Sequence, residues 1–271
     1  MRLGITTGSF FPKSTNETLK EISALGFRNV SINLQRFEFR CGIDITNSTF
    51  YKEMKGLLSE YSLEAVSTHS LFLIGTHVFN EKVRKKILFR SIEISKILET
   101  HILVLHPEYI FKNHKDALKF LSKPNKRYLI DGFKQIVDTA KDYGISLGIE
   151  NVQHWDEFPL LNDPDSIQTV LNYLDNTGFV LDLFHSEMAD NTLDFVNNVG
   201  DSIISIHLSD KDKNRRRILP GEGEIDLVEF ILLLYTIGYD GPLMIELSNS
   251  FNLPRLITSK EYIEKILKST C

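Results

Sequence analysis

Short apolar runs recur along the chain and alternate with longer segments in which apolar residues return every three to four positions. The short runs are rich in β-branched residues, which is typical of parallel strands covered on both faces. In one of the longer segments Leu19, Ile22 and Leu25 share a helix face, with charged residues between them. The pattern predicts strands at 2–7, 29–34, 63–69, 101–106, 145–150, 177–184, 203–208 and 242–247, and helices at 15–25, 48–61, 81–98, 129–143, 164–174 and 226–237.

Eight strands that alternate with helices over roughly 250 residues fit an open doubly wound sheet or a closed barrel. No GxGxxG or GxxxxGK[ST] motif follows any predicted strand, so the phosphate-binding motifs of nucleotide-binding open sheets are absent. Polar residues lie instead at or near the C-terminal ends of the strands, which meet at one rim in a barrel. We therefore predict an α/β fold, a single (β/α)8 TIM barrel over residues 1–271. The strand-end residues are His69, His106, Glu150, Asp182, His207 and Glu246.

Composition and charge exclude several classes of protein. Of the residues, 42% are hydrophobic and 25% are charged, as in globular proteins. The 31 basic and 36 acidic residues give a net charge of −5, which argues against broad nucleic-acid binding. Cys41 and Cys271 are too far apart to indicate a disulfide framework, and no apolar run reaches the ~18 residues of a membrane span. Without the apolar core of a signal peptide, the chain is expected to be cytoplasmic, with no membrane partner.

Four strand-end residues are ionisable and would need a partner if they are buried. Glu150, Asp182 and Glu246 each follow a mostly apolar tripeptide, and His207 ends an apolar run in the same way. A buried carboxylate is costly unless it is paired, hydrogen-bonded or bound to a metal. Any one of the four could pair with a neighbouring Lys or Arg, but together they predict one divalent metal ion. Oxygen-rich ligation with one nitrogen suits manganese, magnesium or cobalt, and zinc also fits.

Several motifs occur in a fixed order along the chain: THS (68–70), LHPE (105–108), GIEN (148–151), LDLFH (181–185), SIHLSD (205–210), PGEGEID (220–226) and IEL (245–247). As a set they resemble the xylose isomerase-like TIM-barrel superfamily over nearly the whole chain. This superfamily includes tagatose 3-epimerase-like and hydroxypyruvate isomerase-like enzymes, inosose dehydratases and, more distantly, the endonuclease IV family. The resemblance implies that Glu150, Asp182, His207 and Glu246 bind one divalent metal, and that the two glutamates act as acid and base.

The chemistry of sugar isomerisation requires a similar arrangement. Moving a proton next to a carbonyl needs a base at the C–H and stabilisation of the enediolate oxygen, which a metal can provide. Glu150 and Glu246 on opposite sides of a sugar, sugar phosphate or keto acid would permit epimerisation, and one glutamate alone would permit aldose–ketose isomerisation. The sequence does not choose between these reactions or dehydration, and it leaves the sugar and the oligomeric state open, a homo-oligomer included.

Other residues are candidates for substrate binding. His185 matches a histidine that contacts a substrate oxygen in the isomerase families. His69 and His106 match two zinc-binding histidines of the endonuclease IV family, and in relatives with one metal such positions line the pocket. Trp155, the only tryptophan, follows the fifth predicted strand and could form an aromatic wall beside the sugar. For His185 a structural role is the alternative, and for Trp155 a surface role.

The basic run KDKNRRR at 211–217 follows His207 and is expected at the rim. A solvated loop is the simplest interpretation of such a run. Arginine forks also suit phosphate and carboxylate, and the resemblance implies a substrate-binding arginine here, for which Arg217 and then Arg215 are the candidates. The endonuclease IV family has Asp-Arg-His in this loop, where the present chain has three arginines at 215–217. These replacements argue against a zinc phosphodiesterase acting on abasic DNA, but the retained His69, His106 and His185 keep it as the alternative function. A non-catalytic ligand-binding barrel is another alternative.

Overall fold

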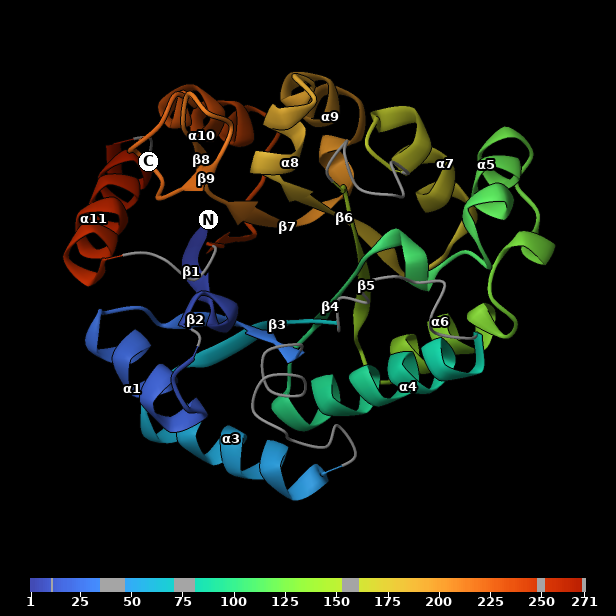
Figure 1. Cartoon of the computed structure of the whole chain (residues 1–271), viewed down its shortest axis with the longest axis horizontal. Helices are drawn as coiled ribbons and strands as arrows, with labels where there is room; N and C mark the ends of the chain where they lie inside the picture. The colour runs from blue at the N-terminus through green and yellow to red at the C-terminus, as the bar shows by residue number, and fades with distance from the viewer. Residues whose placement is uncertain (11, 35–46, 71–80, 153–160, 248–251, 270–271) are drawn as a thin grey trace.

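The strands of the protein form a closed barrel (Figure 1). The computed structural model describes residues 1–10, 12–34, 47–70, 81–152, 161–247 and 252–269. All neighbouring barrel strands are parallel, in the spatial order β1-β10-β7-β6-β5-β4-β3-β2. The predicted TIM barrel is thereby confirmed. Its strands are β1 (Arg2–Thr6), β2 (Asn29–Asn33), β3 (Glu64–His69), β4 (Ile102–Leu105), β5 (Ser146–Glu150), β6 (Thr177–Asp182), β7 (Ile203–Leu208) and β10 (Pro242–Ile245).

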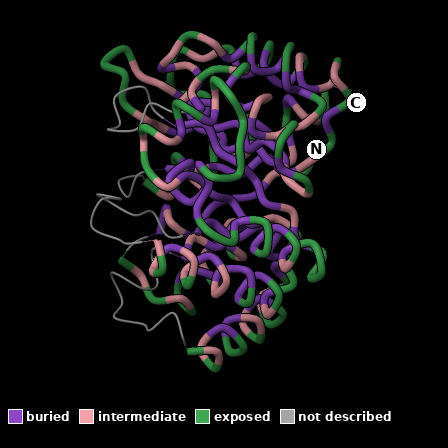
Figure 2. The backbone as a smooth tube through the Cα atoms, turned by 90° about the vertical axis from the view of Figure 1, so that its right-hand side faces the viewer, coloured by how far each residue is buried: buried purple, intermediate pink, exposed green. Residues whose placement is uncertain are grey.

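Helices surround the barrel, and buried residues follow the inside of the molecule (Figures 1 and 2). The first turns have sequence signals that explain where the helices begin. Ser14 and Glu17 form a reciprocal capping box at α1, and Asp163 caps α7 directly before Pro164. The helices are α1 (Thr15–Ala24), α3 (Ser48–Glu60), α4 (Glu81–Leu98), α5 (His114–Ser122), α6 (Phe133–Asp142), α7 (Pro164–Tyr173), α8 (Leu183–Met188), α9 (Thr192–Val199), α10 (Leu227–Thr236) and α11 (Leu253–Ser269).

Two of the predicted boundaries that differ from the structure have a clear local reason. The helix expected from residue 129 begins at Phe133, because Gly132 before it has a left-handed backbone with φ of 76°. The strand expected to reach residue 184 ends at Asp182, because the Asp182 side chain accepts a hydrogen bond from the His185 amide and caps α8. The second difference matters for the site, because the cap holds one oxygen of the Asp182 carboxylate in place.

Close packing fills the barrel below the rim. A Cβ atom at Gly4 would lie 2.6 Å from Cε of Met244 on the neighbouring strand β10. A Cβ atom at Gly148 would lie 2.5 Å from Cγ2 of Val180. These separations are below van der Waals contact, so glycine is required where strands and side chains crowd together. The barrel interior is therefore a packed core, and polar side chains gather at the C-terminal strand ends.

A short antiparallel hairpin follows β7 and consists of β8 (Asp210–Lys211) and β9 (Arg217–Ile218). Lys211 lies opposite Arg217 in the register. The fully buried Asp210 carboxylate anchors the hairpin to the following loop, because it accepts the amides of Gly221 and Gly223 at 3.0 and 2.9 Å and that of Ile225 at 3.1 Å. The expected basic loop is thus an ordered element, and it brings Arg217 to the rim.

Among the helices in the described ranges, none has the length and apolar character to cross a membrane. Three residues discussed from the sequence, Trp155, Cys41 and Cys271, lie outside the described residues. The expected role of Trp155 beside a substrate therefore stays a prediction.

Candidate metal centre at the barrel rim

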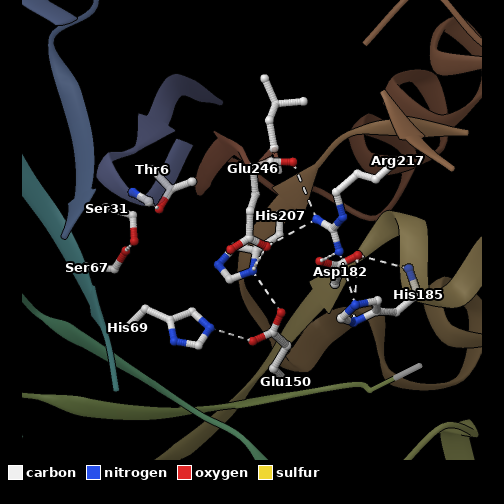
Figure 3. Close-up of polar contacts among 12 residues, drawn as sticks. Thr6, Ser31, Ser67, His69, Glu150, Asp182, His185, His207, Arg217 and Glu246 are labelled. Carbon is white, nitrogen blue, oxygen red and sulfur yellow. Dashed lines mark hydrogen bonds and ion pairs between the residues drawn. The ribbon is translucent and has the colours of Figure 1, made fainter. Parts of the chain in front are cut away.

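Four neighbouring strands bring one acidic or imidazole side chain each to the rim (Figure 3). Glu150 and Asp182 are the last residues of β5 and β6, His207 is next to last in β7, and Glu246 follows β10. Asp182 and His207 lie directly opposite in the register of β6 and β7. One ligand atom from each of the four residues lies within 4.8 Å of the other three. The geometry thus brings together the four residues that the sequence singled out.

Direct contacts connect these groups. Nδ1 of His207 lies 2.9 Å from Oε1 of Glu150 and 3.2 Å from Oε2 of Glu246. The Arg217 guanidinium donates to Oδ2 of Asp182 at 2.8 Å and to Oε2 of Glu246 at 3.2 Å. Glu150, Asp182 and His207 are at most 2% exposed. Three largely buried carboxylates are therefore gathered at the rim, and His207 and Arg217 each contact two of them.

The pKa values follow from this pairing. Burial alone would raise the pKa of Glu150, but the charge of His207 and hydrogen bonds from three histidines hold it well below its ordinary value. Burial also opposes ionisation of Glu246, yet His207 and Arg217 lower its pKa. In the opposite sense, Glu150 and Glu246 outweigh the burial of His207 and raise its pKa well above the usual range. Without another cation in the site, the two carboxylates therefore favour the protonated form of His207.

His69 and His106 face the other oxygen of Glu150. Nε2 of His69 lies 2.9 Å from Oε2 of Glu150, and Nε2 of His106 lies 3.2 Å from the same atom. Burial would lower the pKa of His106, but Glu150 and Glu108 raise it to about 9. These three residues form a second group whose ligand atoms all lie within 4.8 Å of one another. Both histidines therefore lie at the site, as the sequence predicted.

Two hydrogen bonds orient the His185 ring. A guanidinium can only donate, so Nε2 of His185 accepts from Nη2 of Arg217 at 3.0 Å. Nδ1 then carries the proton and donates to the Asn151 carbonyl at 2.8 Å. Arg215 points elsewhere and donates to the Met188 carbonyl, so Arg217 is the arginine of this loop that reaches the candidate site. Its donors contact Asp182, Glu246 and His185.

Two positioning residues were missed by sequence reasoning. Asn151, directly after Glu150, accepts from the Asp182 amide at 2.7 Å and donates to the Asp182 carbonyl at 3.1 Å. It thereby ties the end of β5 to the end of β6. Asp210 holds the hairpin that carries Arg217. Both could have been found by the rule that identified Glu150, since each is a polar residue close after a strand-like apolar run.

The donor set fits a divalent metal. Three carboxylate oxygens and one imidazole nitrogen can converge on one ion without backbone movement, because their atoms already lie within 4.8 Å of one another. The set is rich in oxygen, as manganese, magnesium and cobalt prefer, and zinc tolerates it. A metal would require His207 to be deprotonated, since an imidazolium has no free lone pair on Nδ1.

We expect the metal-free protein to lose stability as the pH rises. The folded-state pKa of His106 is about 9 against an ordinary 6.5, so its contribution is complete below pH 6.5 and disappears as the pH rises through 9. Urea unfolding in a chelator should show a free energy of unfolding lower at pH 9 than at pH 6.5, by on the order of 2 kcal/mol. His106→Gln should flatten this dependence. His101→Gln, at an exposed position before β4, is the matched control, and equal slopes in the two variants would contradict the assignment.

Comparisons with known proteins identify the family and support the barrel fold. A family model described as xylose isomerase-like TIM barrel matches residues 19–266. An uncharacterized protein of Methanocaldococcus jannaschii is 27% identical over 278 aligned positions, which cover 99% of this chain and 90% of that protein. The inosose isomerase of Bacillus subtilis is 25% identical over 162 residues, which cover 56% of this chain and 57% of that protein. The solved structure of a D-tagatose 3-epimerase-like protein is 25% identical with a TM-score of 0.78, covering 100% of this chain and 98% of its own. The chain belongs to the xylose isomerase-like TIM barrel family.

Proposed function

We propose that the protein is a divalent-metal-dependent isomerase or epimerase of a sugar, a sugar phosphate or a related polyol ketone, acting through an enediolate. The observation that carries the proposal is the group formed by Glu150, Asp182, His207 and Glu246 at the barrel rim. The similarity to an inosose isomerase and to a tagatose 3-epimerase-like protein supports the same class of reaction. Glu150, Asp182, His207 and Glu246 would hold the metal. When bound, the metal would supply a Lewis acid for the carbonyl and hydroxyl oxygens of the substrate.

Glu150 and Glu246 are the proposed proton-transfer groups. They come from β5 and β10, the outer two of four adjacent strands, with Asp182 and His207 on the strands between them. Both carboxylates contact the same atom, Nδ1 of His207, and approach it from different strands. A substrate above this group would have one carboxylate on either side. One carboxylate could then remove the proton beside the carbonyl, and the other could return a proton to the opposite face.

The roles of the remaining residues follow from their contacts. His69 and His106 flank Glu150 and would hold its carboxylate in a fixed orientation. Arg217 and His185 form a hydrogen-bonded pair beside Asp182 and would contact substrate oxygens at that end of the site. Because Arg217 already contacts two carboxylates, an uncharged sugar or polyol fits this end better than a phosphate does. Trp155 stays a candidate for an aromatic wall.

Solvent exchange tests the reaction class even while the product is unidentified. The manganese-loaded protein would be incubated in heavy water with a panel of ketoses, aldoses, their phosphates and inososes, and followed by NMR. Deuterium at the carbon beside the carbonyl of one substrate class, abolished by a chelator and restored by metal, is the expected result. Absence of exchange across the panel would favour a non-catalytic ligand-binding barrel.

A zinc phosphodiesterase is the second candidate, and the group of His69, His106 and Glu150 favours it because that group could hold a second ion. The arginines at 215–217 and the net charge of −5 argue against it. We expect the zinc-loaded protein to leave a duplex with an abasic site uncut, in an assay where a known abasic endonuclease cuts it. At saturating metal, elemental analysis should find one bound ion per chain. Metal-dependent incision that co-purifies with the protein through every column would reverse this assignment.

A further inference from the structure

The Arg217 guanidinium occupies a place between two carboxylates of the candidate metal centre. Nη2 lies 2.8 Å from Oδ2 of Asp182, and Nη1 lies 3.2 Å from Oε2 of Glu246. These carboxylates stand at the ends of β6 and β10, which are separated by β7 in the barrel. Figure 3 shows the guanidinium reaching between them from the side of the hairpin. A fixed positive charge therefore contacts two of the four proposed metal ligands.

This position is built into the fold. Arg217 lies in β9, opposite Lys211 of β8, and its guanidinium carbon lies 4.8 Å from the centre of the Phe184 ring. Nη2 also donates to His185, and the side chain is only 13% exposed. Its neighbour Arg216 is different, since that side chain is 72% exposed and pairs with Asp212. The hairpin, the Phe184 ring and His185 thus hold Arg217 beside the candidate metal centre.

The two carboxylates have other groups that orient them. Oδ1 of Asp182 accepts the His185 amide at 2.9 Å, which is the cap of α8. Oε2 of Glu246 lies 3.2 Å from Nδ1 of His207. Loss of the guanidinium would therefore remove a positive charge while leaving the two carboxylates near their present places. A positive charge beside these ligands opposes the entry of a divalent cation, and it also compensates the carboxylates when no metal is bound.

We propose that Arg217 is a resident counter-cation of the metal centre, which stabilises the metal-free protein and weakens its affinity for the divalent ion. This inference rests on the metal binding that is part of the proposed function. The physical consequence is a site that folds without metal and exchanges its ion readily. A centre of three carboxylates without such a cation would instead depend on the metal for its stability.

The test compares four proteins: wild type, Arg217→Gln, Arg217→Lys and the control Arg216→Gln. Each would be freed of metal by chelation and dialysis, and Mn²⁺ binding would be measured by calorimetry and by the electron paramagnetic resonance of free Mn²⁺. We expect at least tenfold tighter Mn²⁺ binding in Arg217→Gln, which keeps a donor but loses the charge. Arg217→Lys keeps the charge and should bind Mn²⁺ within a few-fold of wild type, as should Arg216→Gln.

Thermal unfolding gives a second, independent measure. Without metal, Arg217→Gln should melt below wild type, and saturating Mn²⁺ should raise its midpoint by more than it raises that of wild type. A variant that folds only when Mn²⁺ is added would support the inference, because the metal then replaces the missing charge. If Arg217→Gln remains unfolded in saturating Mn²⁺, the inference is overturned.

The outcomes separate this inference from the proposed function. If wild type binds Mn²⁺ and Arg217→Gln binds it equally or more weakly, Arg217 is not a counter-cation, and the proposed function is unaffected. Weaker binding in both Arg217 variants would assign it to ligand orientation instead. If none of the four proteins binds Mn²⁺, the metal-dependent function and the inference both fail. Binding by Arg217→Gln alone would support the effect of the Arg217 charge and contradict the metal-dependent function of the wild type.

Discussion

Replacing either Glu150 or Glu246 by glutamine should lower the turnover of the metal-loaded enzyme by about 10²–10⁴-fold. Glutamine keeps a carbonyl oxygen for the metal but cannot accept or return a proton at the pH of the reaction. Metal binding should therefore weaken without being lost, while exchange of solvent deuterium beside the carbonyl nearly disappears. The measurement is the rate of exchange and of product formation at saturating Mn²⁺, with bound metal determined on the same sample.

The two variants should differ in their side effects. Glu150 is 1% exposed and contacts His69, His106 and His207, so its replacement should also lower the thermal midpoint of the metal-free protein. The Glu246 side chain is 20% exposed, and glutamine there should disturb the fold less. Glu222→Gln is the matched control, because this carboxylate lies in the rim loop after β9 and pairs with Arg255 away from the centre. Wild-type exchange rates in both metal-loaded variants would make these glutamates ligands only.

The barrel could be predicted from the sequence because each of its strands is recognisable from a few neighbouring residues. Each strand is a short run with apolar residues on both faces, and the absence of phosphate-binding motifs favoured closure over an open sheet. The same pattern identified Glu150, Asp182 and His207, since each ends such a run and strand ends share one rim. The prediction that strand-end residues converge required only the topology.

Contacts that depend on how the strands pair and where the hairpin turns could not be predicted in the same way. The sequence placed Arg217 at the rim, but its position between Asp182 and Glu246 depends on the hairpin turning inward over β7. Likewise, His106 lies 44 residues before Glu150 in the sequence, and only the pairing of β4 with β5 brings them together. The end of β6 was misplaced because the capping role of Asp182 competes with the apolar pattern of the two residues after it.

Asp210→Ala should cause the largest loss of stability outside the metal centre. The Asp210 side chain is fully buried, and its oxygens accept four backbone amides, those of Lys211, Gly221, Gly223 and Ile225, at 2.7–3.1 Å. Alanine would leave these four part-buried donors without their acceptor. Each such donor costs about 1–3 kcal/mol, and water entering the gap would recover part of the sum. We expect the free energy of unfolding in urea to fall by about 3–5 kcal/mol.

Asp210→Ala should also disturb the rim, because the loop held by Asp210 packs against the hairpin that carries Arg217. A Cβ atom at Gly223 would lie 2.3 Å from Oδ1 of Asp210 and 2.4 Å from the Lys211 carbonyl, so this glycine lets the loop pack closely against both the carboxylate and the hairpin. Asp210→Asn keeps the shape but turns one acceptor into a donor, and should lie between wild type and alanine in stability. Asp240→Ala, an exposed aspartate before β10, should stay within about 0.5 kcal/mol of wild type. An Asp210→Ala protein as stable as this control would mean that the loop is held by its apolar contacts, and that Arg217 needs no such anchor to reach the metal centre.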